Sequence, residues 1–203
     1  MFDVSIVDYG VGNIASVGNM VKRLGFSFNI VGDSLSLREA TRIILPGVGA
    51  FDSGMTNLNE LGLRDGLNFM ALEKKVPILG ICLGAQLLGF GSEEGRERGL
   101  GWIDFECQKF QSMDNLKVPH MGWNYVTAEK ESVLSKGISD GRFYFVHSYF
   151  MKPKNQEDIL FSTVYGKKFA AAVAKDNIYG VQFHPEKSHK FGLQLMKNFL
   201  EIC

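Results

Sequence analysis

The residue best suited to do chemistry in this chain is a cysteine held between two glycines. An apolar run over 76–81 ends at Cys82, which has Gly80 and Gly84 two residues away on either side, and apolar residues at helical spacing follow at once. This pattern predicts a strand, a sharp turn and a helix with Cys82 at the apex, because glycine leaves room for a tight turn. A helix start favours the thiolate and offers backbone amides to an oxyanion. A buried cysteine at an ordinary strand end has the same local pattern. Other residues that could act with Cys82 must therefore distinguish a nucleophile from a structural cysteine.

A cysteine nucleophile needs a base, and the base benefits from an orienting carboxylate. His184 ends an apolar strand and is followed by Pro185 and Glu186. Proline fixes φ, so His184 and Glu186 leave the strand from a rigid bend. His184 is therefore the best-placed candidate for the base, with Glu186 as a candidate orienting carboxylate. Three other histidines compete for the role of base: His120, His147 and His189. Of these, His147 lies within a predicted strand rich in aromatic residues, a pattern that also fits a buried histidine with a purely structural role.

Composition fits one globular domain spanning 1–203. The 203 residues include 22 Lys plus Arg and 22 Asp plus Glu, which gives zero net charge, and 45% of them are hydrophobic. A chain of this length can bury a full core. Its neutral balance does not favour non-specific binding to nucleic acid or to an anionic membrane.

The N-terminus and the cysteines indicate a cytoplasmic protein. Residues 1–8 carry an acid where a signal peptide carries basic residues, and their apolar run is too short to span a bilayer. Three cysteines, an odd number, argue against a disulfide framework and for a reducing compartment. Cys107 and Cys203 are most simply structural. No spacing of cysteines or histidines indicates a metal site.

The first half of the chain alternates strands with helices. Apolar runs predict strands over 2–7, 26–31, 42–45 and 76–81, and helical spacing predicts helices over 14–24, with Asn13 as N-cap, and over 58–72. Such alternation predicts a parallel sheet with helices on both faces, where sites gather at the carboxyl ends of the strands. The loops at 8–13, 46–49 and 82–84 all fall at such ends. The first of them, with Gly10 and Gly12, lacks the third glycine of a dinucleotide fingerprint, so nucleotide binding is not favoured.

The second half is β-rich. Strands are predicted over 101–110, 144–150, 159–164, 170–174 and 179–183, with a hairpin turn at Asp176-Asn177 and a closing amphipathic helix over 188–203. The charged segment 93–98 is interpreted as a solvated connection. The predicted fold class is therefore α/β: a mostly parallel central sheet with helices on both faces and antiparallel additions in the C-terminal half.

Two motifs together resemble the class-I (triad) glutamine amidotransferases. They are the run from Gly80 through Cys82 to Gln86, and the run from Gly180 to His184-Pro185-Glu186. The resemblance implies a glutaminase of that family's fold that hydrolyses L-glutamine, with Cys82 as nucleophile, His184 as general base and acid, and Glu186 orienting the imidazole. It implies neither a cofactor nor a metal.

Further blocks narrow the resemblance to the glutaminase subunits of imidazole glycerol phosphate synthase, which act in histidine biosynthesis. These blocks lie at 8–13, 45–51, 118–124 (Val-Pro-His-Met-Gly-Trp-Asn), 145–149 and 187–188, so they span nearly the whole chain. Two places depart from the family pattern. Ala85 stands where methionine is usual, and Trp102-Ile103-Asp104 is similar to a paralogous branch that supplies ammonia for amination in surface-polysaccharide synthesis.

The resemblance also implies roles around the nucleophile. The amides of Leu83 and Val48 would hold the oxyanion. Four residues match family positions around the glutamine: Gly49, Gln86, Ser148 and Tyr149.

A lone glutaminase wastes its ammonia, so a separate partner is expected to use it. The resemblance implies a (β/α)8-barrel cyclase subunit, bound as a heterodimer, that makes imidazole glycerol phosphate and AICAR. Four residues match positions at or near that interface: Asn13, Trp123, Tyr144 and Lys187. Such an enzyme is expected to be nearly silent alone and active when the cyclase binds its ligand.

Several alternatives stay open at this point. One is the paralogous glutaminase of surface-sugar amination, and another is a non-catalytic interaction subunit on the same fold, which an intact Cys82, His184 and Glu186 argue against. The glutaminase subunit of pyridoxal phosphate synthase shares the triad but would not carry the Pro-His-Met-Gly-Trp block. A cysteine peptidase or a chaperone of a related α/β class would lack the His-Pro-Glu run and Gln86.

Overall fold

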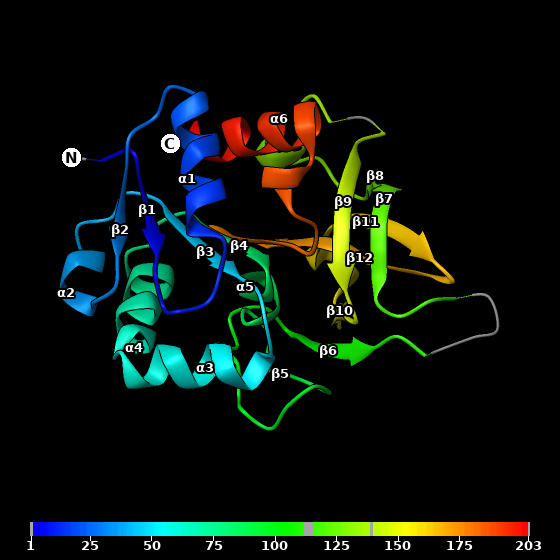
Figure 1. Ribbon diagram of the computed structural model, residues 1–203, viewed down its shortest axis with the longest axis horizontal. Helices are drawn as coiled ribbons and strands as arrows, with labels where there is room; N and C mark the ends of the chain where they lie inside the picture. Colours follow the sequence, from blue (N-terminus) through cyan, green and yellow to red (C-terminus); the bar gives the residue numbers. More distant parts are fainter. Residues whose placement is uncertain (1, 112–115, 139, 203) are drawn as a thin grey trace.

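Five neighbouring strands of the central sheet run parallel in the computed structural model, which describes residues 2–111, 116–138 and 140–202 (Figure 1). In spatial order they are β2 (Phe28–Val31), β1 (Val4–Val7), β3 (Ile43–Gly47), β4 (Ile78–Cys82) and β13 (Ile178–Val181). The inner four are entirely buried, which explains why they appear in the sequence as unbroken apolar runs. The predicted parallel sheet is confirmed.

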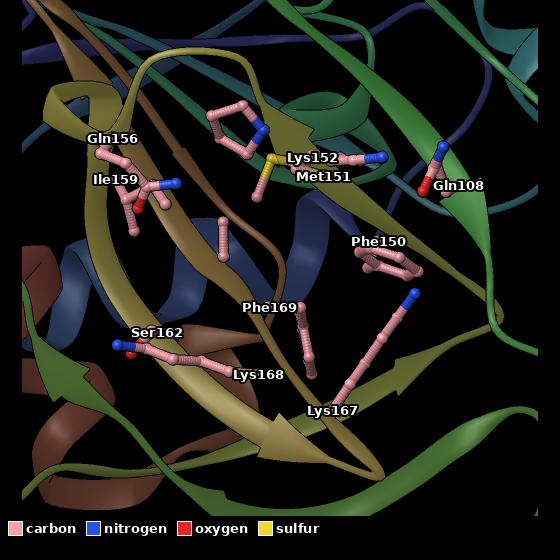
Figure 2. A pocket seen from close by; sticks show the side chains of 12 residues that line it. Gln108, Phe150, Met151, Lys152, Gln156, Ile159, Ser162, Lys167, Lys168 and Phe169 are labelled. Carbon is pink, nitrogen blue, oxygen red and sulfur yellow. The ribbon is translucent and has the colours of Figure 1, made fainter.

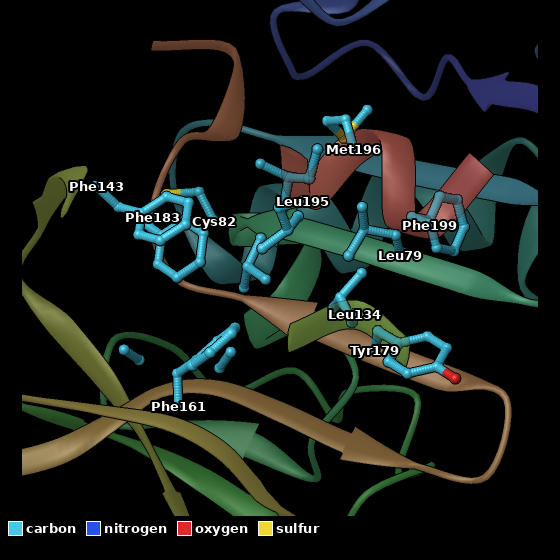
Figure 3. Close-up of a cluster of buried hydrophobic side chains, with 14 of the residues drawn as sticks. Leu79, Cys82, Leu134, Phe143, Phe161, Tyr179, Phe183, Leu195, Met196 and Phe199 are labelled. Carbon is cyan, nitrogen blue, oxygen red and sulfur yellow. The ribbon is translucent and has the colours of Figure 1, made fainter. Parts of the chain in front are cut away.

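Helices cover both faces of this parallel part (Figure 1). On one side lie α1 (Ile14–Arg23) and α6 (His189–Leu200); on the other lie α3 (Phe51–Glu60), α4 (Leu63–Asn68) and α5 (Leu83–Gln86). Each face has its own hydrophobic cluster. Figure 3 shows the first cluster, in which Leu79 of β4 lies near Leu195 and Phe199 of α6 and Cys82 lies at the edge. The strand that carries Cys82 is therefore held by apolar packing on both sides.

The helix predicted over 58–72 is wrong in its bounds. The segment starts earlier, at Phe51, and breaks at Gly62, which has a φ of +65° and ends one helix before α4 begins. A π-helical turn (Phe69–Glu73) follows α4, and a short helix α2 (Ser34–Leu37) was not predicted. Leu61, the C-cap residue of α3 at this break, is 48% exposed.

Antiparallel strands extend the sheet beyond β13. The turn at Asp176-Asn177 joins β13 to β12 (Lys167–Lys175), which confirms the predicted hairpin. The remaining strands of this part are β10 (Tyr149–Pro153), β11 (Ile159–Tyr165), β6 (Phe105–Lys109), β5 (Gly91–Ser92) and β8 (Thr127–Ala128). Short 3₁₀ turns lie at Val133–Ser135, Gln156–Asp158 and Pro185–Lys187.

A separate two-stranded ribbon stands beside the main sheet. It consists of β7 (His120–Tyr125) and β9 (Arg142–His147), paired antiparallel, and is called the β7–β9 ribbon below. The single strand predicted over 144–150 is therefore wrong: the chain leaves the ribbon at Ser148 and enters the main sheet as β10. The strand predicted over 101–110 starts only at Phe105. Residues 102–104 form a bend, in which the amides of Trp102 and Ile103 donate to the Leu88 carbonyl.

Cys203, with which the predicted last helix ends, lies outside the described residues, and α6 ends at Leu200. Among the described helices none combines the length and apolarity needed to span a bilayer.

The close approach of α5 to β3 gives a direct test of the fold. A Cβ on Gly84 would lie 1.8 Å from the carbonyl oxygen of Leu45, whereas a Cβ on Gly91 would meet nothing within 4 Å. We expect Gly84→Ala to lower the free energy of unfolding by at least about 2 kcal/mol, because one backbone must move away from another. Gly91→Ala should stay within about 0.5 kcal/mol of the wild type. Urea unfolding measures both, and equal midpoints for the two variants would contradict the packing described here.

Candidate active site

Cys82 lies on a strained elbow at the carboxyl end of β4. Its φ of +55° and ψ of −108° belong to a region that side-chain-bearing residues rarely adopt. The surrounding glycines explain how the chain reaches it. A Cβ on Gly80 would lie 2.6 Å from the carbonyl oxygen of Gly84, and a Cβ on Gly47 would lie 2.5 Å from the hydroxyl of the fully buried Tyr9. The thiol therefore points away from β4 at the edge where β3, β4 and β13 end.

His184 and Glu186 form a buried pair beside that edge. Nδ1 of His184 lies 2.8 Å from Oε1 of Glu186, and each side chain is only 3% exposed. The backbone of His184 is tied to the β7–β9 ribbon, since its amide donates to the carbonyl of Tyr144 at 2.9 Å. Ser188 adds a bond from its hydroxyl to the His184 carbonyl at 2.6 Å. Both the imidazole and its carboxylate are thus fixed in direction.

The free edge of His184 is available for proton transfer. Among the described residues neither Nε2 of His184 nor Oε2 of Glu186 has a hydrogen-bond partner. Burial alone lowers the pKa of His184, but the neighbouring Cys82 and the bonded Glu186 raise it further than burial lowers it, so the pKa lies well above its ordinary value. The site therefore favours an imidazolium, the partner that stabilises a thiolate.

One cavity of about 300 Å³ brings most of the predicted site residues together. The predicted residues that line it are Val48, Gly49, Cys82, Leu83, Gln86, Ser148, Tyr149, His184 and Lys187. Glu186 is not among the lining residues but bonds His184 as described. A second cavity of about 330 Å³, where Lys167 lies over the ring of Phe150, contains none of the predicted residues (Figure 2).

Glu94 also lines the cavity, although it was not predicted as a site residue. The interpretation of 93–98 as a solvated connection is confirmed by the exposure of every residue in it except Gly95, but the segment also lines the cavity and is anchored by hydrogen bonds. Oε2 of Glu94 accepts a bond from the Phe51 amide at 2.9 Å, and Asp52 accepts bonds from the amides of Arg96 and Glu97, both at 2.9 Å. The two carboxylates cross-link this loop to the start of α3. A glutamate in a charged run has the same sequence pattern whether it is solvated or anchored.

The four predicted interface residues lie in two places. Trp123 and Tyr144 face one another across the β7–β9 ribbon with ring centroids 6.0 Å apart, and Lys187 places its Nζ 5.7 Å from the Tyr144 ring. Lys187 also lines the cavity, so it connects this aromatic pair to the cavity wall. Asn13 is exposed at the start of α1, where its side chain accepts a bond from the Ser16 amide, so its predicted N-cap role is confirmed.

Comparison with known proteins identifies the family. The model of the glutamine amidotransferase class-I family matches residues 5–203. The chain belongs to the class-I glutamine amidotransferases. The imidazole glycerol phosphate synthase subunit HisH 2 of Pseudomonas aeruginosa is 54% identical over 200 residues, covering 98% of this chain and 99% of the relative. The protein of the same name from Methanococcus maripaludis is 53% identical over 199 residues, covering 98% of each chain. These relatives confirm the predicted function, the glutaminase subunit of imidazole glycerol phosphate synthase in histidine biosynthesis.

Solved structures of class-I amidotransferases share the fold. A glutamine amidotransferase crystal structure superposes with a TM-score of 0.77 at 19% identity, covering 98% of this chain and 97% of the other. A chain of the PurLQS structure from Thermotoga maritima gives 0.75 at 19% identity, covering 97% and 96%. The predicted α/β architecture is thus confirmed. In the part of this amidotransferase that the structure describes, no group of three or more His, Cys, Asp or Glu side chains could hold a metal ion.

The strain at Cys82 predicts that glycine is a more stable replacement there than alanine, the reverse of the usual order. A Cβ at a φ of +55° costs on the order of 1 kcal/mol, so Cys82→Gly should be more stable than Cys82→Ala by about that amount. Cys107 is the matched control, because it is a buried free thiol in the ordinary strand β6. There alanine should be the more stable replacement by about 1 kcal/mol. Urea unfolding of the four variants measures both differences, and the same ranking at both sites would refute strain at the elbow.

Proposed function

We propose that this amidotransferase hydrolyses L-glutamine through a thioester on Cys82 and passes the ammonia to a (β/α)8-barrel cyclase subunit in the cytoplasm. The observation that carries the proposal is the strained Cys82, which shares one cavity with His184, itself bonded to the buried Glu186. Free thiols on Cys82 and Cys107 fit a reducing compartment.

The first chemical step forms the thioester. The thiolate of Cys82 attacks the side-chain amide carbon of glutamine, and the negative oxygen that develops is held by the amides of Leu83 and Val48. Imidazolium at His184 gives its proton to the departing nitrogen, and ammonia leaves. The raised pKa of His184 supports this step, since the proton is present at neutral pH.

The second step releases glutamate. His184, now neutral, takes a proton from water while the water oxygen attacks the thioester carbon, and the sulfur leaves as thiolate. Glu186 keeps Nδ1 protonated throughout, so that Nε2 faces the reacting atoms. The two steps consume glutamine and water and leave glutamate and ammonia.

The cavity also offers a way to recognise the amino-acid end of glutamine. Glu94 is an acidic side chain in the cavity wall and suits the α-ammonium group. Its position is set by its own bond to the Phe51 amide and by the bonds that Asp52 makes to the same loop. Gly49, Ser148 and Tyr149 form the rest of the wall around the substrate.

The β7–β9 ribbon suits the docking of the cyclase subunit. Its outer side presents Met121, Trp123 and Tyr125, which are 61%, 37% and 62% exposed, and Arg142 lies over both aromatic rings. Aromatic residues, methionine and arginine are enriched at protein interfaces. The ribbon also adjoins the cavity mouth at Tyr144 and Lys187, where a partner could receive ammonia before it escapes.

Glutamate release from glutamine tests the reaction and the partner together. We expect the purified chain alone to turn over slowly, and addition of a histidine-pathway cyclase subunit with its ribonucleotide ligand to stimulate it. Cys82→Ala should lower the stimulated rate at least about 1,000-fold, because no second nucleophile replaces the thiol.

Each other outcome of this assay has a defined meaning. Stimulation by a paralogous partner, but not by the histidine-pathway cyclase, would assign this glutaminase to surface-sugar amination instead of histidine biosynthesis. Strong activity of the isolated chain would contradict the coupling to a partner. No turnover under any condition would overturn the catalytic role and leave a non-catalytic subunit on this fold.

Asp52 should affect the binding of glutamine more than its turnover. Asp52→Ala removes the carboxylate that accepts from the Arg96 and Glu97 amides and so holds the loop of Glu94. KM for glutamine should therefore rise about tenfold while kcat changes less than about threefold. Asp65→Ala is the matched control, since Asp65 is likewise an acid in the first turn of a neighbouring helix, α4, and is exposed. Steady-state kinetics of the stimulated enzyme give both constants. An equal rise in KM for the two variants would assign the effect to helix stability instead of loop anchoring.

A further inference from the structure

A line of hydrogen bonds runs inward from the β7–β9 ribbon. Nδ2 of Asn124 lies 3.4 Å from Nε2 of His120, and Nδ1 of His120 lies 2.9 Å from Nε2 of His147. His120 and His147 are 3% and 6% exposed. The inner side of the ribbon thus carries a buried histidine pair directly behind its exposed aromatic residues.

The same line continues to the nucleophile. Nδ1 of His147 lies 2.6 Å from the carbonyl oxygen of Tyr149, which also accepts a bond from Nε2 of Gln86 at 3.1 Å. That amide nitrogen donates its second proton to Oε1 of Gln182 at 3.1 Å, and Nε2 of Gln182 contacts the sulfur of Cys82 at 3.8 Å. Every link from the ribbon to the thiol is a polar contact between buried or partly buried groups.

The donors and acceptors of this line allow only one arrangement of protons. A carbonyl oxygen only accepts, so His147 carries its proton on Nδ1 and accepts at Nε2. His120 then donates from Nδ1 and accepts from Asn124 at Nε2. The amide of Asn124 is oriented independently, because its Nδ2 also donates to the Val164 carbonyl and its Oδ1 accepts from the Tyr125 amide. Burial lowers the pKa of His120 to about 4 and that of His147 to about 3, so both are neutral at pH 7.

Aromatic packing fixes the orientation of the His120 ring that its two hydrogen bonds require. Its ring stacks on Tyr165 at 4.0 Å and on Phe145 at 4.8 Å, with interplanar angles of 24° and 25°. Rotation of the imidazole would lose both stacking contacts and both hydrogen bonds. The pair therefore behaves as a rigid connection and not as a loosely held core contact.

We propose that His120 and His147 are positioning residues: they connect the β7–β9 ribbon to the wall of the active site by holding the Tyr149 carbonyl, and through Gln86 and Gln182 they fix the surroundings of the Cys82 sulfur. The proposal rests on the proposed function, in which the ribbon receives the partner and Cys82 attacks glutamine. Binding of a partner to the outer face of β7 would then act on the cavity through the inner face of the same strand. A change in the register or tilt of β7 would displace the Tyr149 carbonyl without any contact between partner and substrate.

The proton positions can be tested without catalysis. In long-range ¹H–¹⁵N spectra of the histidine-labelled full chain at pH 7, His147 and His120 should each show a protonated Nδ1 and an unprotonated Nε2. Free imidazole side chains favour the opposite tautomer, so this signature is specific to the line. A proton on Nε2 of His147, or a doubly protonated ring, would overturn the proposal.

Two substitutions of His120 separate positioning from packing. His120→Phe keeps a ring between Tyr165 and Phe145 but removes both nitrogens, whereas His120→Asn keeps a donor at the place of Nδ1 but loses the stacking. We expect the phenylalanine variant to have a near-normal Tm but a kcat/KM for the partner-stimulated glutaminase lowered about tenfold. The asparagine variant should have the lower Tm and the better kcat/KM, within about threefold of the wild type.

The opposite ranking would assign His120 to packing alone. If activity follows Tm, so that phenylalanine is active and asparagine impaired, the positioning role is refuted. Equal activity of both variants and the wild type would refute it as well. If the wild-type complex shows no glutaminase activity, the proposed function fails, and the tautomers of His147 and His120 still decide whether the line exists.

Discussion

The geometry of the site depends on one contact between two backbones that carry no side chains where they meet. Gly84 in α5 faces the Leu45 carbonyl in β3, and a Cβ at Gly47 would lie 2.7 Å from the Gly84 amide nitrogen. Because the helix start lies this close to the neighbouring strand, Cys82 must take a φ of +55° and project beyond the sheet edge. Such strain costs on the order of 1–3 kcal/mol and persists only where the surrounding structure enforces it. The two hydrophobic clusters on the faces of the sheet supply that enforcement. The same contact brings the residues after β3, which include Val48, to the cavity of Cys82.

A second constraint is the burial of charge next to the nucleophile. Glu186 and His184 are each 3% exposed in their side chains, and burying two such groups costs more than their attraction returns unless the geometry is good. A buried ion pair is therefore weak evidence for stability and better evidence for a function that needs it. In the proposed mechanism that function is to raise the pKa of the His184 imidazole, whose Nε2 has no hydrogen-bond partner among the described residues. The rigid bend at Pro185, together with the bond from Ser188 to the His184 carbonyl, keeps that nitrogen in place.

The parts of this protein that were predictable from sequence are those that depend on local rules. Unbroken apolar runs indicated the parallel strands, glycines around Cys82 indicated the elbow, and Asp176-Asn177 indicated the hairpin. The errors arose where tertiary contacts override local pattern. Glu94 is anchored by residues more than forty positions earlier: its carboxylate accepts from the Phe51 amide, and Asp52 accepts from the Arg96 amide in the same loop. The strand expected over 144–150 divides at Ser148 because its halves pair with strands of two different sheets, and pairing partners are not visible in local sequence. The β7 strand was missed because its apolar residues point outward and its histidine inward, the reverse of the usual alternation.

That reversal explains how the short strand β7 can contribute both to the exposed outer face of the ribbon and to its buried inner face. A strand sends alternate side chains to opposite faces, so Met121, Trp123 and Tyr125 share one face of β7 and His120 and Asn124 share the other. An outward polar face and an inward apolar face would stabilise the ribbon better, since polar groups buried without partners are costly. The observed arrangement is tolerated because the inward imidazoles are bonded to one another, to Asn124 and to the Tyr149 carbonyl. Under the proposed function, its benefit is that the apolar face is left for the partner while the polar face reaches the cavity of Cys82. A ribbon of the usual pattern would bury its apolar side chains in the protein and leave a partner no rigid polar path to the nucleophile.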